Sequence, residues 1–329
     1  MSNILSGKKV LVAGGTGMIG IHLVKMLVEL GALVRIASLD DPSRAHTGAE
    51  FMFKDLTRLD NCLDVCRGMD FVFNLLGVKA SPDIASNKPA RFMYSTVLME
   101  MNMLEAAYRE GVSGYLLTSS VGVYAPAEIL NEDDVWKTFP SPNDWFTGWS
   151  KRIGELQVDA YRKEYGWDRI AIVRPANVYG PYDNFERENA MVVPSLIKRA
   201  ISGKNPLRVW GDGRAVRDFI HAKDVAMGML LVVEKMPEKP VNLGSGVGVS
   251  IKTLTEIIIS NLPEKPDVLW DESKVRGDDQ RILNILRAKE LGFEPKISLE
   301  QGIKETMDWY REHKDISDMR YDVYDRTDS

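Results

Sequence analysis

The segment from Val10 to Gly20, VLVAGGTGMIG, constrains the fold of this 329-residue chain more than any other. A short apolar run typical of a buried strand comes first, and an apolar helical pattern follows it. Glycines between them suit a tight turn, a close approach of the backbone to phosphate, and a helix N-terminus that faces the phosphate. We therefore predict a dinucleotide-binding turn, with these cofactor contacts: Gly14, Thr16, Gly17, Met18, Ile19 and Gly20.

Apolar runs alternate with helical patterns through the first half of the chain. We expect strands at residues 10–13, 34–37, 71–75, 114–119 and 169–174, and helices at residues 19–30, 59–67, 95–110 and 150–165. The strands show little polar alternation, which indicates a parallel sheet covered on both faces. The predicted fold class is α/β, a Rossmann-type doubly wound parallel sheet with a smaller C-terminal substrate lobe.

The pattern changes near residue 179, where Pro and Gly become frequent and helical segments at residues 192–202 and 254–261 follow irregularly. We predict a dinucleotide-binding Rossmann domain over residues 1–178. A lobe that binds mainly the nucleotide sugar is expected over residues 179–314, with a charged tail over 315–329. Some segments of the lobe, such as the strand-like run at 241–243, are expected to return to the main sheet.

Composition and charge exclude several functions. The net charge of −5 argues against nucleic acid as a partner. No apolar stretch approaches the roughly 20 residues of a membrane span, and the N-terminus lacks a secretory signal, so we expect a cytoplasmic protein without a membrane partner. Cys62 and Cys66 are expected to be reduced thiols, with a dithiol switch as the alternative. No His stands at metal-ligand spacing, and we expect no metal.

An acid is expected about 20 residues beyond the glycine turn, where it would bind the adenine ribose. Asp40 follows a predicted strand there and would repel a 2′-phosphate, whereas Ser38 and Arg44 could hold one. NAD is therefore the favoured cofactor, and NADP is the alternative. Asp55 and Leu56 follow the next strand-like run and are assigned to the adenine edge, although a solvated acid in a loop would look the same.

Six motifs occur in the order found in one family: GGTGMIG, NLLG, TSSVGVY, GWSK, RPANVYGP and GDGRAVRDFIHAKDVA. Together they resemble the extended short-chain dehydrogenase/reductase family of nucleotide-sugar epimerases, dehydratases and reductases. Within it, NVYGPYDNF and MVVPSLIKRA look most like the GDP-fucose synthases and related GDP-sugar enzymes. The resemblance implies a nucleotide-diphosphate sugar, GDP-linked, as substrate. Together with the Met-rich run MEMNML, it also implies a homodimer formed by the helices at 95–110 and 150–165. The alternative for this run is a stripe that packs against the sheet.

The resemblance also assigns site residues. Ser120 matches the hydroxyl that contacts the substrate, and Lys151 matches the lysine that bridges the nicotinamide ribose and lowers the pKa of a catalytic tyrosine. Ser120 could instead be only a strand-end hydroxyl, Lys151 a solvated helix lysine, and Arg217 a partner of Asp218 or Asp224. Leu75 and Gly77 are assigned to the cofactor. The substrate contacts are assigned to Lys79, Val121, Gly122, Asn177, Tyr182, Asn184, Val193, Trp210, Arg217 and Arg281.

The main departure from the family is Thr147, which stands where the Tyr-x-x-x-Lys motif has its tyrosine. An aliphatic hydroxyl has a pKa far above the roughly 10 of a phenol, and the threonine side chain is shorter. Three accounts stay open: a proton relay through Ser120, water or another tyrosine; an engineered or inactivated chain; and a binding protein that has lost catalysis. Thr147 is retained as a candidate catalytic residue beside Ser120 and Lys151.

Two further departures narrow the reaction. Family dehydratases carry an Asp-Glu pair where this chain has Val121 and Gly122, and GDP-fucose synthases use a Cys and a His where it has Gly122 and Tyr182. Elimination of water and epimerisation at C3 and C5 are therefore poorly supported. We expect redox chemistry at a sugar hydroxyl or ketone, at C4 of a GDP-hexose or GDP-heptose. The alternatives are a 4-epimerase and a catalytically silent nucleotide-sugar-binding protein.

Overall fold

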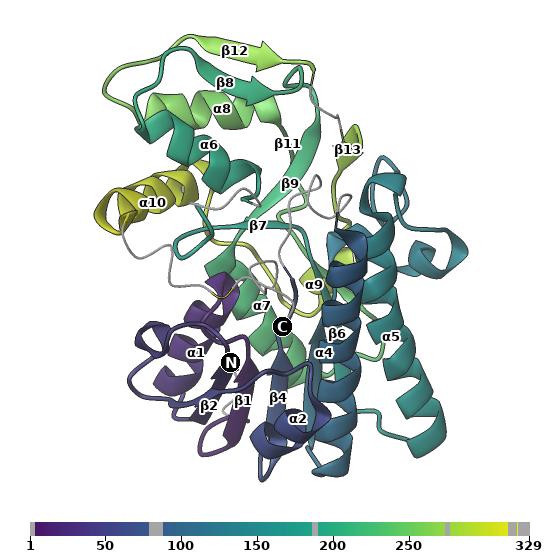
Figure 1. The fold of residues 1–329 in the computed structure, drawn as a ribbon. Coiled ribbons are helices and arrows are strands. Elements are labelled where there is room, and N and C mark those ends of the chain that lie inside the picture. Colours follow the sequence, from purple (N-terminus) through teal and green to yellow (C-terminus); the bar gives the residue numbers. More distant parts are fainter. Residues whose placement is uncertain (1–3, 79–87, 186–189, 274–276, 315–320, 322–329) are drawn as a thin grey trace.

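A computed structural model describes residues 4–78, 88–185, 190–273, 277–314 and 321. A seven-stranded sheet forms the lower half of the molecule in Figure 1, and all of its strands are parallel. In spatial order the strands are β10 (Val241–Leu243), β6 (Ile170–Pro175), β5 (Gly114–Thr118), β4 (Phe71–Asn74), β1 (Lys9–Ala13), β2 (Leu33–Ser38) and β3 (Glu50–Phe53). The predicted parallel α/β fold is confirmed.

Helices cover both faces of this sheet, as the apolar strands require. On one face lie α1 (Met18–Glu29) and α7 (Ala222–Lys235), and on the other lie α2 (Leu59–Cys66), α4 (Pro89–Arg109) and α5 (Trp145–Tyr165). Successive residues of a strand point to opposite faces, so Val10 and Val12 join the first core and Leu11 and Ala13 the second. Each fully buried aliphatic side chain contributes about 1.5–3 kcal/mol, which makes both cores stabilising.

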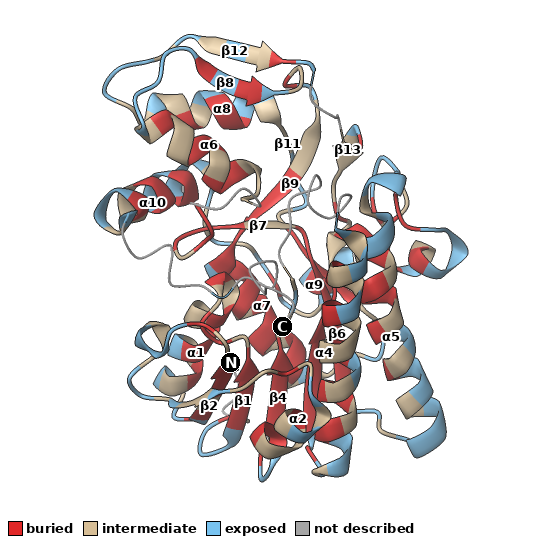
Figure 2. Cartoon of the chain, viewed as in Figure 1, coloured by how far each residue is buried: buried red, intermediate tan, exposed pale blue. Residues whose placement is uncertain are grey.

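A smaller lobe lies above the sheet in Figure 1 and has its own buried core, seen in red in Figure 2. Val193, Leu207, Phe219 and Ile303 are among the buried residues of this core. The lobe contains the strands β7 (Asn177–Tyr179), β8 (Leu207–Trp210), β9 (Val216–His221), β11 (Gly248–Ser250), β12 (Val268–Asp271) and β13 (Gln280–Arg281). Its helices are α6 (Val192–Ile201), α8 (Ile251–Ser260) and α10 (Leu299–Glu312), while α9 (Leu286–Glu290) contacts β10 below.

The structure corrects two predicted helix boundaries. The helix expected at 95–110 begins at Pro89, which suits a first helical position because that position needs no N–H. The helix expected at 150–165 begins at Trp145, directly after the 3-10 helix η4 (Pro142–Asp144). Trp145 is exposed, so the first turn of α5 lacks the apolar periodicity that marks a helix. Helices α7 and α10 were not predicted at all.

Both cysteines lie in the core beneath α2. Cys62 and Cys66 are free and fully buried, and burial raises the pKa of Cys62 to about 12 and that of Cys66 further. They pack as small apolar side chains. No helix in the described part of the chain is long and apolar enough to cross a membrane.

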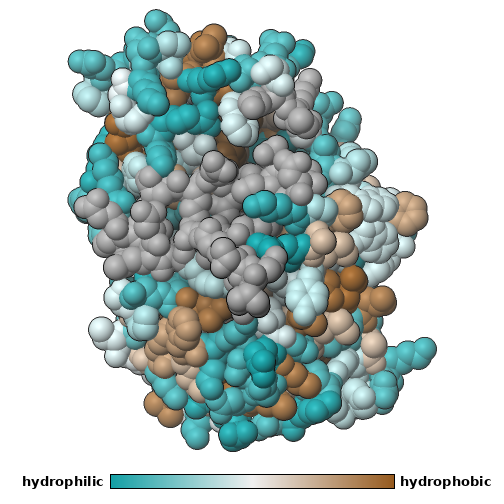
Figure 3. Space-filling model, in the orientation of Figure 1, coloured by the Kyte–Doolittle hydropathy of each residue, from teal (hydrophilic) through white to brown (hydrophobic). Residues whose placement is uncertain are grey.

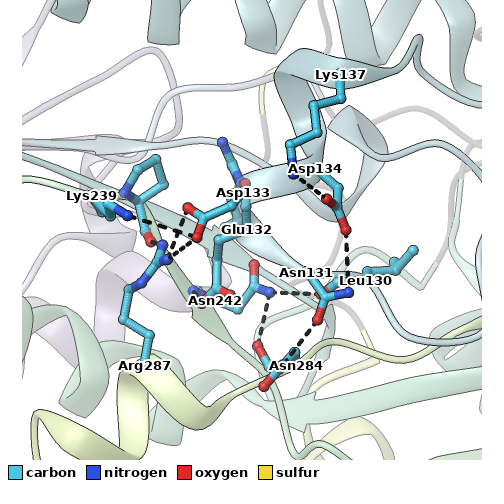
Figure 4. A network of polar contacts seen from close by, with 12 residues as sticks. Leu130, Asn131, Glu132, Asp133, Asp134, Lys137, Lys239, Asn242, Asn284 and Arg287 are labelled. Atoms are coloured by element: carbon cyan, nitrogen blue, oxygen red, sulfur yellow. Dashed lines mark hydrogen bonds and ion pairs between the residues drawn. The ribbon is translucent and has the colours of Figure 1, made fainter.

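A buried amide ties the edge strand β10 to the loops beside it (Figure 4). Asn242 donates to the carbonyl oxygens of Leu130 (3.1 Å) and Asn284 (2.9 Å), and accepts from the Tyr124 hydroxyl (2.6 Å). Its backbone N–H donates to Glu132 in the 3-10 helix η3 (Glu132–Lys137). Because Tyr124 ends the turn that follows β5, this network also fixes the position of residues 120–124.

We predict that Asn242→Ala lowers the free energy of unfolding by about 2–4 kcal/mol, because each buried partner left unsatisfied costs roughly 1–3 kcal/mol. Asp134→Ala is the matched control, since Asp134 pairs with exposed Lys137 at the rim of the same network (Figure 4). It should leave the urea midpoint almost unchanged. Equal losses in the two variants would show that the buried amide is not what stabilises this region.

Candidate active site

One pocket opens at the carboxyl ends of β1, β4, β5 and β6. The strand order reverses between β1 and β4, and ligands of open parallel sheets bind at such a reversal. Twelve of the predicted site residues line this pocket: Gly14, Gly17, Met18, Ile19, Gly20, Leu75, Gly77, Ser120, Val121, Lys151, Asn177 and Val193.

The prediction missed other residues of the lining: Leu76, Val78, Thr118, Ser119, Pro175, Ala176, Val178, Met191, Val192, Pro194 and Phe219. Several of these follow directly on β4, β5 or β6. The rule that ligands bind at the carboxyl ends of parallel strands would have found them.

The glycine turn has a shape that lets a phosphate approach the protein backbone closely. Gly14 has φ +81°, in the left-handed region, and a Cβ on Gly20 would lie 2.7 Å from the Cα of Gly15. Gly17 caps α1 without any side-chain hydrogen bond to the N–H groups of its first turn. A helix N-terminus of this kind binds anions, so the residues present fit the pyrophosphate of a dinucleotide.

The residues predicted to contact the adenine ribose lie together at the carboxyl end of β2. The Thr16 hydroxyl lies 2.7 Å from both the Ser38 hydroxyl and the Asp40 carboxylate. The backbone N–H of Tyr321 donates to Asp40 (2.8 Å), and Arg44 donates to the Thr16 carbonyl. Asp40 is thus a buried negative charge beside the glycine turn.

The two residues assigned to the adenine edge have clear local roles. Asp55 accepts from the backbone and hydroxyl of Thr57, at 3.0 Å and 2.7 Å. The Leu56 side chain packs in the core beneath α2. Neither residue lines the pocket described above.

Ser120 and Thr147 face the same point from two elements. Ser120 caps the 3-10 helix η2 (Val121–Val123), where its oxygen accepts from the Gly122 N–H at 3.1 Å. Thr147 lies in the first turn of α5, and its hydroxyl donates to the Asp144 carbonyl at 3.0 Å. Each hydroxyl oxygen lies 3.6 Å from the position that a Cβ on Gly122 would occupy. Gly122 therefore leaves a small open space between the two hydroxyls.

Lys151 is not a solvated lysine, because it is buried at the floor of the pocket. Its ammonium donates to the Leu76 carbonyl (3.0 Å), the Thr118 carbonyl (3.0 Å) and the Glu100 carboxylate (2.6 Å). Burial raises the pKa of Glu100 to about 7, although the Lys151 ammonium opposes that shift.

The sequence analysis missed Glu100, although a signal was present. Glu100 lies on the buried stripe of α4 with Thr96, Met103 and Ala107, at helical spacing. A carboxylate on a buried stripe requires a partner, because an isolated buried charge is very costly.

Two arginines predicted to contact the substrate lie side by side in the lobe, and neither lines the pocket. The register of β9 and β13 places Arg217 opposite Arg281. Arg281 pairs with Asp278 and with Asp144, and burial together with Arg281 lowers the pKa of Arg217 to about 10. Asp218 accepts instead from Ser245, Gly246 and Leu283, so the alternative that it pairs with Arg217 is wrong.

The other residues predicted to contact the substrate do not all lie at the pocket. Asn177 donates to the Asp218 carbonyl (3.0 Å) at the pocket wall, whereas the Tyr182 ring lies between His22 and Trp309. Trp210 is half exposed on β8, beneath the Arg199 guanidinium.

Asn184 is buried, and its backbone N–H donates to Asp183. Lys79 and all of the predicted tail except Tyr321 fall outside the described residues. Within the described ranges, no three His, Cys, Asp or Glu side chains gather as metal ligands.

This fold and this pocket define a dinucleotide-binding protein of the Rossmann class. The chain belongs to the NAD dependent epimerase/dehydratase family, whose sequence model matches residues 10–244. The resemblance to extended short-chain dehydrogenases/reductases is thereby confirmed, and with it the assignment to an NAD-dependent enzyme family.

Relatives of known activity match almost the whole chain. The chain is 30% identical to GDP-L-fucose synthase 1 of Arabidopsis thaliana, over 92% of this chain and 93% of that protein. It is 28% identical to a dTDP-4-dehydro-6-deoxy-D-allose reductase of Streptomyces, over 94% of this chain and 98% of that protein. The structure of UDP-glucose 4-epimerase from Thermotoga maritima with UDP-glucose superposes with a TM-score of 0.82 and 28% identity, over 93% and 100%.

Proposed function

We propose that the protein is an NAD(P)-dependent nucleotide-sugar oxidoreductase that acts at a sugar hydroxyl or ketone. One observation carries the proposal: Ser120 and Lys151 line the same pocket as the glycine turn. A hydroxyl and an ammonium thus lie where a nicotinamide dinucleotide would present its reactive ring. When bound, that group supplies the hydride acceptor or donor.

The residues of the chain must then handle the proton of the sugar hydroxyl. The Gly122 N–H donates to Ser120, so the Ser120 proton is available for a substrate oxygen. Thr147 donates its only proton to the Asp144 carbonyl, which leaves its oxygen as an acceptor. Neither hydroxyl is a strong base, so we infer that the proton reaches solvent through Ser120 or an ordered water. General-base assistance is worth about 100- to 10,000-fold, and a slow enzyme is expected without it.

We assign the substrate to GDP-linked sugars and the reacting carbon to C4. The first is supported by the similarity to GDP-L-fucose synthase and the second by the similarity to a 4-dehydro-sugar reductase. Arg217 and Arg281 offer planar forks of donors that suit the diphosphate. Val121 and Gly122 in η2 carry no acid or base, which supports redox chemistry rather than dehydration.

Two alternatives each have an observation in their favour. A 4-epimerase would use the same hydride step twice, and the similarity to UDP-glucose 4-epimerase favours it. A catalytically silent nucleotide-sugar-binding protein is favoured by Thr147, which removes the usual proton acceptor.

The test is turnover with a panel of GDP-, UDP- and dTDP-linked sugars, followed by nicotinamide absorbance and product analysis. We expect Lys151→Ala to lower kcat at least 100-fold, because the pocket loses its only ammonium among the described lining residues. Thr147→Val should change kcat less than tenfold. Thermal unfolding controls for folding of both variants. Full activity of Lys151→Ala would contradict the mechanism, and binding of NADH without turnover of any sugar would favour the silent protein.

We propose that the site prefers NAD(H) to NADP(H), because the buried Asp40 carboxylate would lie close to a 2′-phosphate and repel it. NADH should bind at least tenfold more tightly than NADPH, a difference of about 1.4 kcal/mol. Asp40→Asn should reduce the ratio of the NADPH dissociation constant to the NADH dissociation constant. Asp41→Asn is the control, since the exposed Asp41 carboxylate accepts from the Ser43 N–H, whereas Asp40 accepts from Thr16. Tighter binding of NADPH by the unmodified protein would show that Arg44 determines the preference.

We also propose a homodimer formed by α4 and α5 packed against their copies. Tyr94, Met101 and Tyr108 follow one another at seven-residue spacing on α4 and are exposed, as are Leu156 and Tyr165 on α5. Figure 3 colours each residue by hydropathy, and some of its hydrophobic residues (brown) lie on the right-hand side of the view, where Figure 1 places α5. Four helices packed in this way would bury that surface. A monomer mass by light scattering at micromolar concentration would contradict this arrangement.

A further inference from the structure

All three N–H donors of the Lys151 ammonium are engaged within the chain. A lysine ammonium has three N–H donors, and the three acceptors here are two carbonyl oxygens and the Glu100 carboxylate. The Glu100 oxygen lies only 2.6 Å from Nζ, so above its raised pKa of about 7 the negative charge of Glu100 cancels most of the lysine charge for any group further away.

The surroundings of Glu100 are built to hold this carboxylate. A Cβ on Gly154 would collide with it, lying 3.0 Å from the Glu100 Cδ, so only glycine at that position of α5 leaves the necessary space. The second carboxylate oxygen of Glu100 is buried and has no hydrogen-bond partner among the described residues. Lys151 is thus the main polar partner of Glu100, which makes the two residues one unit.

A second buried pair one turn along α5 shows what a structural ion pair looks like here. Glu155 receives two hydrogen bonds from Arg174, at 2.8 and 2.6 Å, and a third from Ser119 at 2.5 Å. Arg174 in turn donates to Tyr124 and to the Glu132 carbonyl. Neither residue of that pair lines the pocket, whereas Lys151 of the Glu100–Lys151 pair does. One oxygen of Glu100 has no hydrogen-bond partner among the described residues.

Position 147 lies one helical turn before Lys151, on the same side of α5. An unpaired ammonium at such a distance lowers the pKa of an acid by about 1–3 units. Thr147 is not an acid in the accessible pH range, so this chain has no group at that position for the lysine charge to act on.

We propose that Glu100 is a positioning residue that neutralises Lys151 and fixes its ammonium. Lys151 then acts in this site as a hydrogen-bond donor that holds its neighbours in place. It does not act as a source of positive charge toward position 147. Glu100 and Thr147 are then related features of the site, because a chain without a phenol at position 147 has no acid there for an unpaired lysine charge to act on. The inference rests on the proposed function, in which Lys151 faces the cofactor.

The test introduces a phenol at position 147 and measures its ionisation by ultraviolet difference titration against Thr147→Phe. With Glu100 in place, the phenol of Thr147→Tyr should titrate at its ordinary value of roughly 10 or above. Removing the pair as a whole with Glu100→Gln and Lys151→Met should leave that value within half a unit, because two opposite charges 2.6 Å apart exert little net field at position 147. Adding Glu105→Gln is the matched control on the same helix, where Glu105 pairs with Arg109 and Tyr161, and it should change nothing.

The titration needs neither cofactor nor substrate, so its result is independent of whether the protein turns over a nucleotide sugar. Glu100 is ionised throughout the range in which a phenol titrates. A phenol more than one unit below its ordinary value in Thr147→Tyr alone would overturn the proposal. A rise of one unit or more when the Glu100–Lys151 pair is removed would also overturn it, because the intact pair would then have acted as a positive charge. If the variant without the Glu100–Lys151 pair does not fold, the Thr147→Tyr variant alone still decides the question.

Discussion

The parallel direction of the seven strands is the constraint on which the site depends. It brings the carboxyl ends of β1, β4, β5 and β6 to one edge, although these strands are far apart in the sequence. The glycine turn, Gly77, Ser120 and the residues after β6 therefore meet at one pocket without any long loop to carry them. Buried parallel strands require helices on both faces, and α5, one of those helices, supplies Lys151.

Helix α5 organises the buried charges of the molecule. Lys151 and Glu155, four residues apart, both point inward, one toward Glu100 on α4 and the other toward Arg174 on β6. Removing charges from water is expensive, and a buried pair is retained only when its geometry repays much of that cost. Arg174 and Glu155 meet this condition through a network that continues to Tyr124 and Asn242. The Glu100–Lys151 pair meets it less completely, which is consistent with a functional role at the pocket floor.

Local patterns were sufficient to predict most of the sheet and the glycine turn, whereas Ser120 and Lys151 were assigned by the family resemblance. A strand, its turn and the following helix are encoded within about 20 neighbouring residues. Contacts between distant segments were not predictable in this way. Arg217 and Arg281 lie opposite each other only because of the register of β9 and β13. The hydrogen bond between Tyr321 and Asp40 joins segments near opposite ends of the chain. Glu100 was overlooked because the run MEMNML was interpreted as apolar dimer surface, although Glu100 itself points into the protein.

The central claim is that the glycine turn and the pocket beside it bind a nicotinamide dinucleotide. The most direct measurement is the affinity for NADH, by fluorescence titration, of the unmodified protein and of Gly20→Val. The Val side chain would meet the backbone of Gly14 and Gly15, so affinity should fall at least 100-fold, or about 2.7 kcal/mol. Gly122→Ala, whose added methyl group would make only ordinary contacts, should bind as the unmodified protein does. Equal affinity for NADH in a folded Gly20→Val variant would contradict the account.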